Sequence, residues 1–354
     1  MWFIVTVNII AVVLSYFAKF KDCRFLFSFA FVLLTIVYSL RYDFGNDYWG
    51  YFDTFHDCQI YDSEDLRIEI GWYYLCRLCA PIGYFGLVIV ITIFQNLVVY
   101  NFIKKNVEKD WWWFAVFIFA FNFNYMLLGC SMMRQYTAMV LCLWASQYIL
   151  HKRIVPFTFF VGLAISIHTS AILFALTYLF AYFRPPLYKK YIILISLVVV
   201  CVMIASSELM DAAINQFLTL AFFESYETYS DWEAGTKSLG IVFELMMMTI
   251  LMSSHPKQEN DIQICNYTML LHYLIMPFTF VILIVNRLSL YYSLFSLACF
   301  PYAIKEIKNK SVQIMILVIF VFFTWRRFVQ SITGETYGSF YQTFNTIFDS
   351  SVWL

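Results

Sequence analysis

The chain has 354 residues, of which 62% are apolar and only 13% are charged, and its mean hydropathy is +0.72. A soluble domain of this length needs more charge to cover its surface, so the composition excludes an ordinary soluble protein. Its net charge is zero, which leaves no basic surface for nucleic acid as a partner.

Apolar runs of near-spanning length recur along the chain, and a helix needs roughly 20 apolar residues to cross a bilayer. We predict an all-α, polytopic integral membrane helical bundle with about 12 transmembrane helices (10–12) and helical external loops. Residues 1–354 form a single integral membrane domain. The expected helices cover residues 1–18, 25–40, 82–103, 111–128, 131–150, 154–167, 168–183, 190–206, 238–253, 263–285, 288–304 and 311–325.

The pair of runs at 154–183 is too short for two comfortable spans. It is expected to be a broken helix or a re-entrant pair, which a membrane tolerates where protein or a watery cavity shelters the backbone. The number of spans therefore depends on how this pair folds.

Lysines fall in every second connection between the expected helices, for example at Lys19 and Lys21, at Lys104 and Lys105, and at Lys305. The positive-inside rule assigns such connections to the cytoplasm. Both termini are then expected on the outer side. The cations left outside are almost all arginines, which suggests forked contacts with phosphate or carboxylate.

Two expected external loops, 41–81 and 207–237, contribute to a substrate cavity in this interpretation, because both mix acids with aromatic rings. Carboxylates accept hydrogen bonds from sugar hydroxyls, and rings stack on sugar faces. The alternative is an aromatic belt at the membrane interface. Candidate glycan-binding residues in the first loop are Asp43, Tyr48, Glu69 and Trp72.

The segment from Arg41 to Tyr48 follows the second expected helix directly. Gly45 permits a tight turn or a positive φ, which would let Arg41 and Asp47 face one site. Asp47 is the first candidate for a general base toward a sugar hydroxyl. The alternative is an ion pair between Asp47 and an arginine.

Arg134 and Gln135 lie at the outer start of a helix, where a guanidinium beside free backbone N–H groups suits an anion such as a diphosphate. A snorkelling arginine that orients the helix is the alternative. Asn286-Arg287 marks a second outer helix turn, and Arg287 is a further candidate for binding phosphate. Trp325-Arg326-Arg327 is expected to mark the membrane interface.

His168 stands at the junction of the two short apolar runs, on the side of Arg41 and Arg134. A histidine at a break in a membrane helix is a functional candidate, and His168 is our second candidate for the base. His272 lies within an unbroken apolar run, so we expect a structural role there.

Motifs for soluble chemistry are missing from the sequence. It has no G-x-x-x-x-G-K-[ST], G-x-G-x-x-G, H-E-x-x-H or G-x-S-x-G pattern. We therefore expect no cofactor such as ATP or a dinucleotide. A metal site has no support either, because no D-x-D occurs in the first external loop.

A succession of short motifs resembles the EpsG family of bacterial exopolysaccharide and capsule polymerases, which are similar in role to the Wzy O-antigen polymerases. The motifs cover residues 38 to about 303. In chain order they are Arg41 with Gly45-Asn46-Asp47-Tyr48, Tyr51 and Phe55, then Glu69-Ile70-Gly71-Trp72, Arg134-Gln135, His168-Thr169-Ser170-Ala171 and Asn286-Arg287.

The resemblance implies a repeat-unit polymerase in the cytoplasmic membrane of a bacterium. Such an enzyme transfers glycan from an undecaprenyl-diphosphate carrier to another lipid-linked unit at the outer face. Arginines there would balance the charge that develops on the diphosphate as the glycosidic bond breaks. Arg134 and Arg287 are expected as this clamp, with Arg41 and Gln135 in support, and metal is not required. The implied partners are undecaprenyl-diphosphate-linked oligosaccharide, a chain-length regulator and the flippase of the same pathway.

Other readings stay open. An O-antigen-type ligase shares this chemistry but uses another acceptor, and a lipid-linked oligosaccharide flippase also needs arginines near a diphosphate. A membrane acyltransferase is a weaker alternative, based on one buried histidine. The outward bias of the charges favours chemistry at one membrane face.

Overall fold

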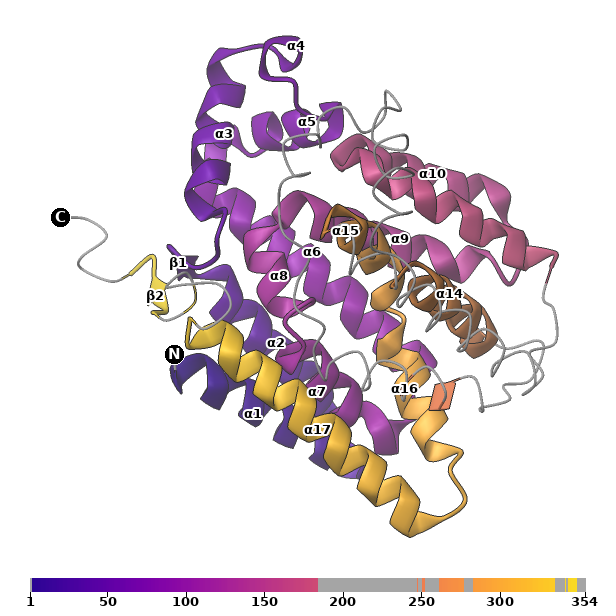
Figure 1. Ribbon diagram of the computed structural model, residues 1–354. Helices are drawn as coiled ribbons and strands as arrows, with labels where there is room; N and C mark the ends of the chain where they lie inside the picture. The colour runs from indigo at the N-terminus through magenta and orange to yellow at the C-terminus, as the bar shows by residue number, and fades with distance from the viewer. Residues whose placement is uncertain are drawn as a thin grey trace, which may run out of the picture.

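The structure, a computed structural model, describes residues 2–183, 247, 250–251, 261–276, 283–334, 341 and 343–348. Within these residues the chain is almost wholly helical, apart from turns and one pair of two-residue strands (Figure 1). The expected all-α fold class is confirmed. The expected helix 190–206, the loop 207–237 and most of the helix 238–253 lie outside the described residues.

The N-terminal part of the bundle contains four helices: α1 (Trp2–Phe17), α2 (Phe25–Ser39), α6 (Gly83–Asn106) and α7 (Trp112–Phe121). Asn8, buried in α1, donates from Nδ2 to the Ala120 carbonyl at 2.8 Å and accepts from the Tyr38 hydroxyl at 3.2 Å. Hydrogen bonds of this kind hold membrane helices together where lipid supplies no hydrophobic drive. One asparagine therefore joins α1, α2 and α7.

Three further helices lie between α2 and α6, in the expected external loop 41–81: α3 (Tyr48–Ile60), α4 (Ser63–Leu66) and α5 (Ile70–Leu78). They share a small core of their own with the start of α6, formed by side chains such as Phe55, Trp72 and Leu87. The loop is helical, as predicted. Figure 1 shows these helices grouped at one end of the bundle.

The expected helix 111–128 is wrong as a single element, because the chain breaks between α7 and α8 (Met126–Ser131). The turn Asn122-Phe123-Asn124 causes the break: the Asn122 side chain accepts from the Asn124 backbone N–H at 3.0 Å. Asparagine favours such turns because its side chain replaces a backbone partner.

Next come α9 (Met133–Ala145), α10 (Ile154–Ile167) and the 3₁₀ segment η5 (Thr169–Ala181). The expected helix 131–150 is therefore shorter, and the expected break at His168 is confirmed, since its φ of −154° and ψ of 112° are extended. α10 packs against both α9 and η5.

The C-terminal helices are α14 (Asp261–Ile275), α15 (Leu283–Ser293), α16 (Ser296–Lys305) and α17 (Lys310–Ile332). The expected helix 288–304 is wrong as one piece, because the chain breaks after Ser293. The Ser293 carbonyl accepts from the Tyr125 hydroxyl at 2.7 Å and so has a partner outside its helix. α17 extends beyond the expected end at 325.

Strand β1 (Arg41–Tyr42) pairs antiparallel with β2 (Asn345–Thr346). The Phe3 and Phe344 rings lie 5.6 Å apart, so the start of α1 and the segment around β2 meet at the end of the bundle that carries α3–α5. The connections that carry lysines are joined by ion pairs of their own. Lys105 forms an ion pair with Asp261 at 3.0 Å, and Lys305 forms one with Glu108.

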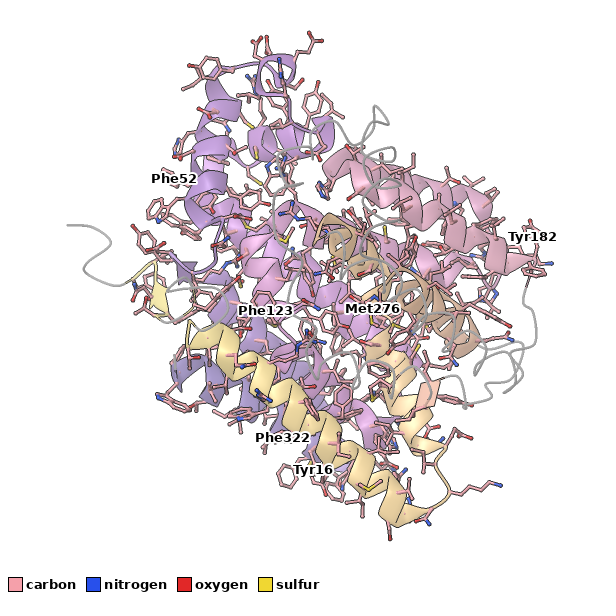
Figure 2. All side chains as sticks on the ribbon, in the orientation of Figure 1. Tyr16, Phe52, Phe123, Tyr182, Met276 and Phe322 are labelled. Atoms are coloured by element: carbon pink, nitrogen blue, oxygen red, sulfur yellow. The ribbon has the colours of Figure 1, made fainter. Side chains whose placement is uncertain are left out.

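Three described helical segments are long and apolar enough to cross a membrane: Lys21–Ser39, Ala80–Asn106 and Lys310–Ile332. Aromatic side chains also project outward from the bundle, including Tyr16, Tyr182 and Phe322 (Figure 2). Large exposed apolar surfaces of this kind suit contact with lipid. The protein is a helical membrane protein, and its number of spans stays a prediction.

Candidate functional site

The carboxylate of Glu69 binds two predicted site residues at once. Its Oε2 accepts from Nη1 of Arg134 at 2.8 Å, and its Oε1 accepts from Nδ1 of His168 at 2.9 Å. Glu69 directly precedes α5, Arg134 lies in α9, and His168 lies at the break between α10 and η5. Glu69 was expected only as a weaker glycan-binding candidate, yet it connects the diphosphate candidate Arg134 to the candidate base His168.

The backbone around Glu69 explains how it reaches both partners. Glu69 is the residue before α5, and its extended backbone (φ −65°, ψ 134°) turns the chain into that helix. Two residues on, Gly71 packs directly against Ser166 at the end of α10. This close approach of α5 to α10 brings the Glu69 carboxylate beside His168.

Arg134 lies in the first turn of α9, as predicted. Its guanidinium carbon is 5.9 Å from the centre of the Tyr51 ring, and its backbone N–H donates to the Tyr51 hydroxyl at 3.4 Å. A cation above an aromatic face is attracted by the ring quadrupole. Tyr51 of α3 therefore contacts both the guanidinium and the backbone of Arg134.

Charge and burial act in opposite directions on Glu69. Burial alone would raise the pKa of this carboxyl group, but the hydrogen bond from His168 and the positive charge of Arg134 lower the pKa to about 2. Glu69 is therefore ionised at neutral pH. An ionised carboxylate only accepts hydrogen bonds, so Nδ1 of His168 carries the proton between them.

The other ring nitrogen of His168, Nε2, is buried and has no hydrogen-bond partner among the residues that the structure describes. With the proton on Nδ1, a neutral imidazole presents Nε2 as an acceptor. Two residues after His168, the Ser170 hydroxyl is 3.0 Å from the Tyr291 hydroxyl of α15. Residues 168–170 thus contact both α5 and α15.

Arg287 of α15 is held near this cluster by Gln135. The Gln135 side chain donates from Nε2 to the Arg287 carbonyl at 2.6 Å, and Gln135 is only 1% exposed. Gln135 was expected to support diphosphate binding directly. In the structure its side chain anchors the backbone of Arg287 to α9, and its contact with a diphosphate stays a prediction.

Asp47 lies within the electrostatic field of both arginines. Asp47 is exposed as a residue, but partial burial of its carboxyl group raises the pKa of that group. The positive charges of Arg287 and Arg134 partly offset the rise. The structure therefore brings together Asp47, Arg134 and Arg287, along with Glu69 and His168.

The loop that carries Asp47 is fixed by α8. Gly45 has a φ of +116°, and a Cβ there would lie 2.7 Å from the Cys130 carbonyl oxygen, so the predicted positive φ is confirmed. The Asn46 N–H donates to the Ser131 hydroxyl at 2.7 Å, and Ser131 also bonds to Tyr341.

Arg41 does not join the cluster. It is 1% exposed, and its Nη1 donates to the Tyr38 carbonyl at 2.7 Å and to the Thr92 hydroxyl at 2.9 Å. These bonds connect α2, β1 and α6. We assign Arg41 a structural role and leave it out of the anion site.

The remaining glycan candidates differ in their surroundings. Tyr48 and Trp72 are buried, at 1% and 0% exposure, and the Trp72 ring packs 5.5 Å from that of Tyr51. Both side chains belong to the small core that α3 and α5 share with the start of α6. Asp43 is exposed and accepts from the Trp49 indole N–H at 2.7 Å, so this pair remains accessible to a sugar.

Among the residues that the structure describes, no three His, Cys, Asp or Glu side chains gather as a metal-binding group. The sequence places Tyr51 in the family motif but gives it no role, because no local pattern shows that its ring lies beside Arg134.

Comparison with known proteins gives one result. The model of the EpsG family matches residues 24–343. No curated protein and no solved structure matches the chain significantly.

Proposed function

The chain belongs to the EpsG family, a family of exopolysaccharide biosynthesis, and on this premise we propose that it is a polysaccharide repeat-unit polymerase. It transfers glycan from an undecaprenyl-diphosphate carrier to a second lipid-linked unit at the outer face of the cytoplasmic membrane. The proposal is supported above all by one observation: Glu69 joins Arg134 to His168.

Arg134 and Arg287 bind the donor diphosphate in this proposal. Negative charge develops on the diphosphate as its bond to the sugar breaks, and fixed cations stabilise that charge. Glu69 and Tyr51 hold the Arg134 guanidinium in place, and Gln135 holds the backbone of Arg287. Such preorganisation avoids reorientation of the arginines during the reaction.

His168 is the general base. Glu69 orients its ring through Nδ1, which leaves Nε2 to accept a proton from the acceptor hydroxyl. A base held by a neighbouring carboxylate is a common arrangement for activating a hydroxyl group. Asp47, the first candidate from the sequence, becomes the second candidate here; its raised pKa brings it nearer to the range that suits a base.

These groups account for every bond and proton that changes in the transfer. The acceptor hydroxyl oxygen bonds to the anomeric carbon of the donor glycan as its proton moves to Nε2 of His168. The bond between that carbon and the diphosphate oxygen breaks, and its electron pair leaves with undecaprenyl diphosphate. Arg134 and Arg287 neutralise the leaving group.

The orientation rests on the lysine pattern. Lys105 and Lys305 belong to connections that the positive-inside rule assigns to the cytoplasm, and they lie on helices α6 and α16. α6 runs from Gly83, next to the α3–α5 group, to Asn106 beside these lysines. The Glu69 cluster is therefore assigned to the outer face, where lipid-linked units await polymerisation.

Deletion of the gene, followed by analysis of lipid-linked glycan, tests the proposal. A polymerase predicts that single repeat units accumulate outside the membrane. Units retained on the cytoplasmic side indicate a flippase, and long lipid-linked polymer that never reaches a final acceptor indicates a ligase. Either of the last two results contradicts the proposal. The chain-length regulator and the flippase are proposed as separate proteins of the pathway.

A further inference from the structure

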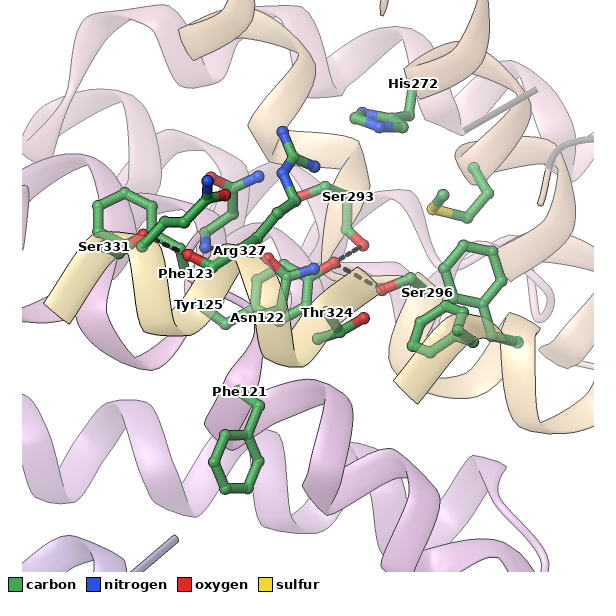
Figure 3. Close-up of a pocket in the computed structure, with 15 residues that line it drawn as sticks. Phe121, Asn122, Phe123, Tyr125, His272, Ser293, Ser296, Thr324, Arg327 and Ser331 are labelled. Carbon is green, nitrogen blue, oxygen red and sulfur yellow. Dashed lines mark hydrogen bonds between the residues drawn. The ribbon is translucent and has the colours of Figure 1, made fainter. Parts of the chain in front are cut away.

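A cavity with a volume of about 150 Å³ lies where α14, α15, α16 and α17 approach the turn between α7 and α8, at Asn122–Tyr125. Its lining includes Asn122, Asn124, His272, Ser293 and Arg327. Figure 3 shows the side chains of His272 from α14 and Arg327 from α17 facing this space. None of these residues belongs to the Glu69 cluster.

The walls of the cavity are fixed by hydrogen bonds. The Tyr125 hydroxyl lies 2.7 Å from the Ser293 carbonyl and 2.6 Å from the Ser296 hydroxyl (Figure 3). Nδ1 of His272 donates to the Ser289 carbonyl at 3.1 Å. Since these bonds join the turn before α8 to α15 and α16, and α14 to α15, the cavity is preformed.

The lining has the chemistry of a site for an acidic sugar. Asparagine, glutamine, serine and threonine side chains suit hydroxyl groups, and rings such as Phe123 and Phe300 suit the apolar face of a sugar. Arg327 supplies a positive charge to the lining. A guanidinium binds a carboxylate through two parallel hydrogen bonds.

The size of the cavity and its place relative to the Glu69 cluster suit one residue of a bound glycan. An engineered cavity of about 150 Å³ holds benzene, so the space here accommodates a single six-membered ring. α15 carries Arg287 near Asp47 and Ser293 at the cavity. With a rise of 1.5 Å per residue, these two positions are about 9 Å apart along the helix.

We infer that this cavity binds one carboxylate-bearing sugar residue of the glycan and so selects repeat units that contain an acidic sugar. That the natural ligand is the glycan rests on the proposed function. The ability to bind an acidic sugar depends only on the residues of the cavity. Arg327 binds the sugar carboxylate, and the neutral side chains bind its hydroxyls.

Saturation-transfer NMR on the purified full-length protein in detergent tests the inference, with sodium glucuronate as the probe and glucose as the uncharged comparison. We expect glucuronate to give at least fivefold more transfer than glucose. Arg327→Gln should reduce the glucuronate signal at least fivefold. Arg326→Gln should leave it unchanged, because this neighbouring arginine does not line the cavity.

Other outcomes overturn the inference. Equal signals from glucose and glucuronate exclude recognition of the carboxylate, and an unchanged signal in Arg327→Gln excludes this cavity. Displacement of glucuronate by an equal concentration of inorganic phosphate shows a site for anions alone. The measurement is repeated in an Arg134→Ala variant, where binding should persist. Failure of the polymerase proposal alone therefore leaves the glucuronate result intact.

Discussion

Gly71 of α5 lies so close to Ser166 of α10 that a Cβ at position 71 would be 2.7 Å from the Ser166 carbonyl oxygen. No real Cβ tolerates that distance. The absence of a side chain at Gly71 therefore allows α5 to approach α10 and allows Glu69, two residues earlier, to reach His168.

Gly71→Ala should separate α5 from α10 and weaken the Glu69–His168 contact. Overpacking of this kind costs roughly 1–3 kcal/mol, so we expect a lower thermal unfolding midpoint together with short or absent polymer. Gly50→Ala is the matched control, since no atom lies within 4 Å of a Cβ at this helical position. Normal polymer and an unchanged midpoint in Gly71→Ala would show that the close approach is unimportant.

Arg134→Lys should lower polymerisation by about 10- to 100-fold. The estimate follows from a hydrogen bond to a charged group, which contributes about 1.5–3 kcal/mol, since a lysine cannot reproduce the planar, forked contact. The readout is polymer length in cells whose own gene is deleted. Arg67→Lys, at an exposed arginine of the external segment 41–81, should behave as wild type. Full activity of Arg134→Lys contradicts a forked contact.

His168→Ala and Asp47→Asn distinguish the two candidate bases. We expect His168→Ala to lower the rate at least 100-fold, a loss within the range for general base catalysis. Asp47→Asn should lower it less than tenfold, because the arginines keep their other contacts. The rate is measured with membranes that contain equal amounts of each variant. The reverse order of effects would assign the base to Asp47.

The low pKa of Glu69 predicts an acid-sensitive contribution to stability. Its carboxyl pKa falls from 4.5 to about 2 on folding, so folding favours the ionised form. The contribution is complete above pH 4.5 and disappears as the pH falls toward 2. Thermal unfolding of wild type and Glu69→Gln should therefore differ most above pH 4.5 and converge below it. A difference that grows on acidification contradicts the assignment.

The sequence predicted those features that depend on local pattern. A short polar interruption between apolar runs indicated the break at His168, and the start of an apolar run indicated that Arg134 begins a helix. Gly45 has the predicted positive φ. The breaks after Asn122 and Ser293 were missed because they depend on a side-chain turn and on a contact with a distant tyrosine.

The roles of individual site residues depended on distant contacts that no local pattern contains. Glu69 is one of many acids in its segment, and its partners lie 65 and 99 positions away. Gln135 contacts Arg287 at a separation of 152 positions. Arg41 shared its predicted side with Arg134, but Tyr38 and Thr92 bind its guanidinium inside the bundle.

Reconstitution tests the central claim most directly. Purified protein in liposomes is supplied with undecaprenyl-diphosphate-linked repeat units, and both glycan length and released undecaprenyl diphosphate are measured. We predict a ladder of polymer with one carrier released per new linkage, and at least a tenfold loss of both in Glu69→Gln. Glu64→Gln, at an exposed acid of the same segment, should match wild type. Equal polymer and carrier release from Glu69→Gln and wild type would contradict the account.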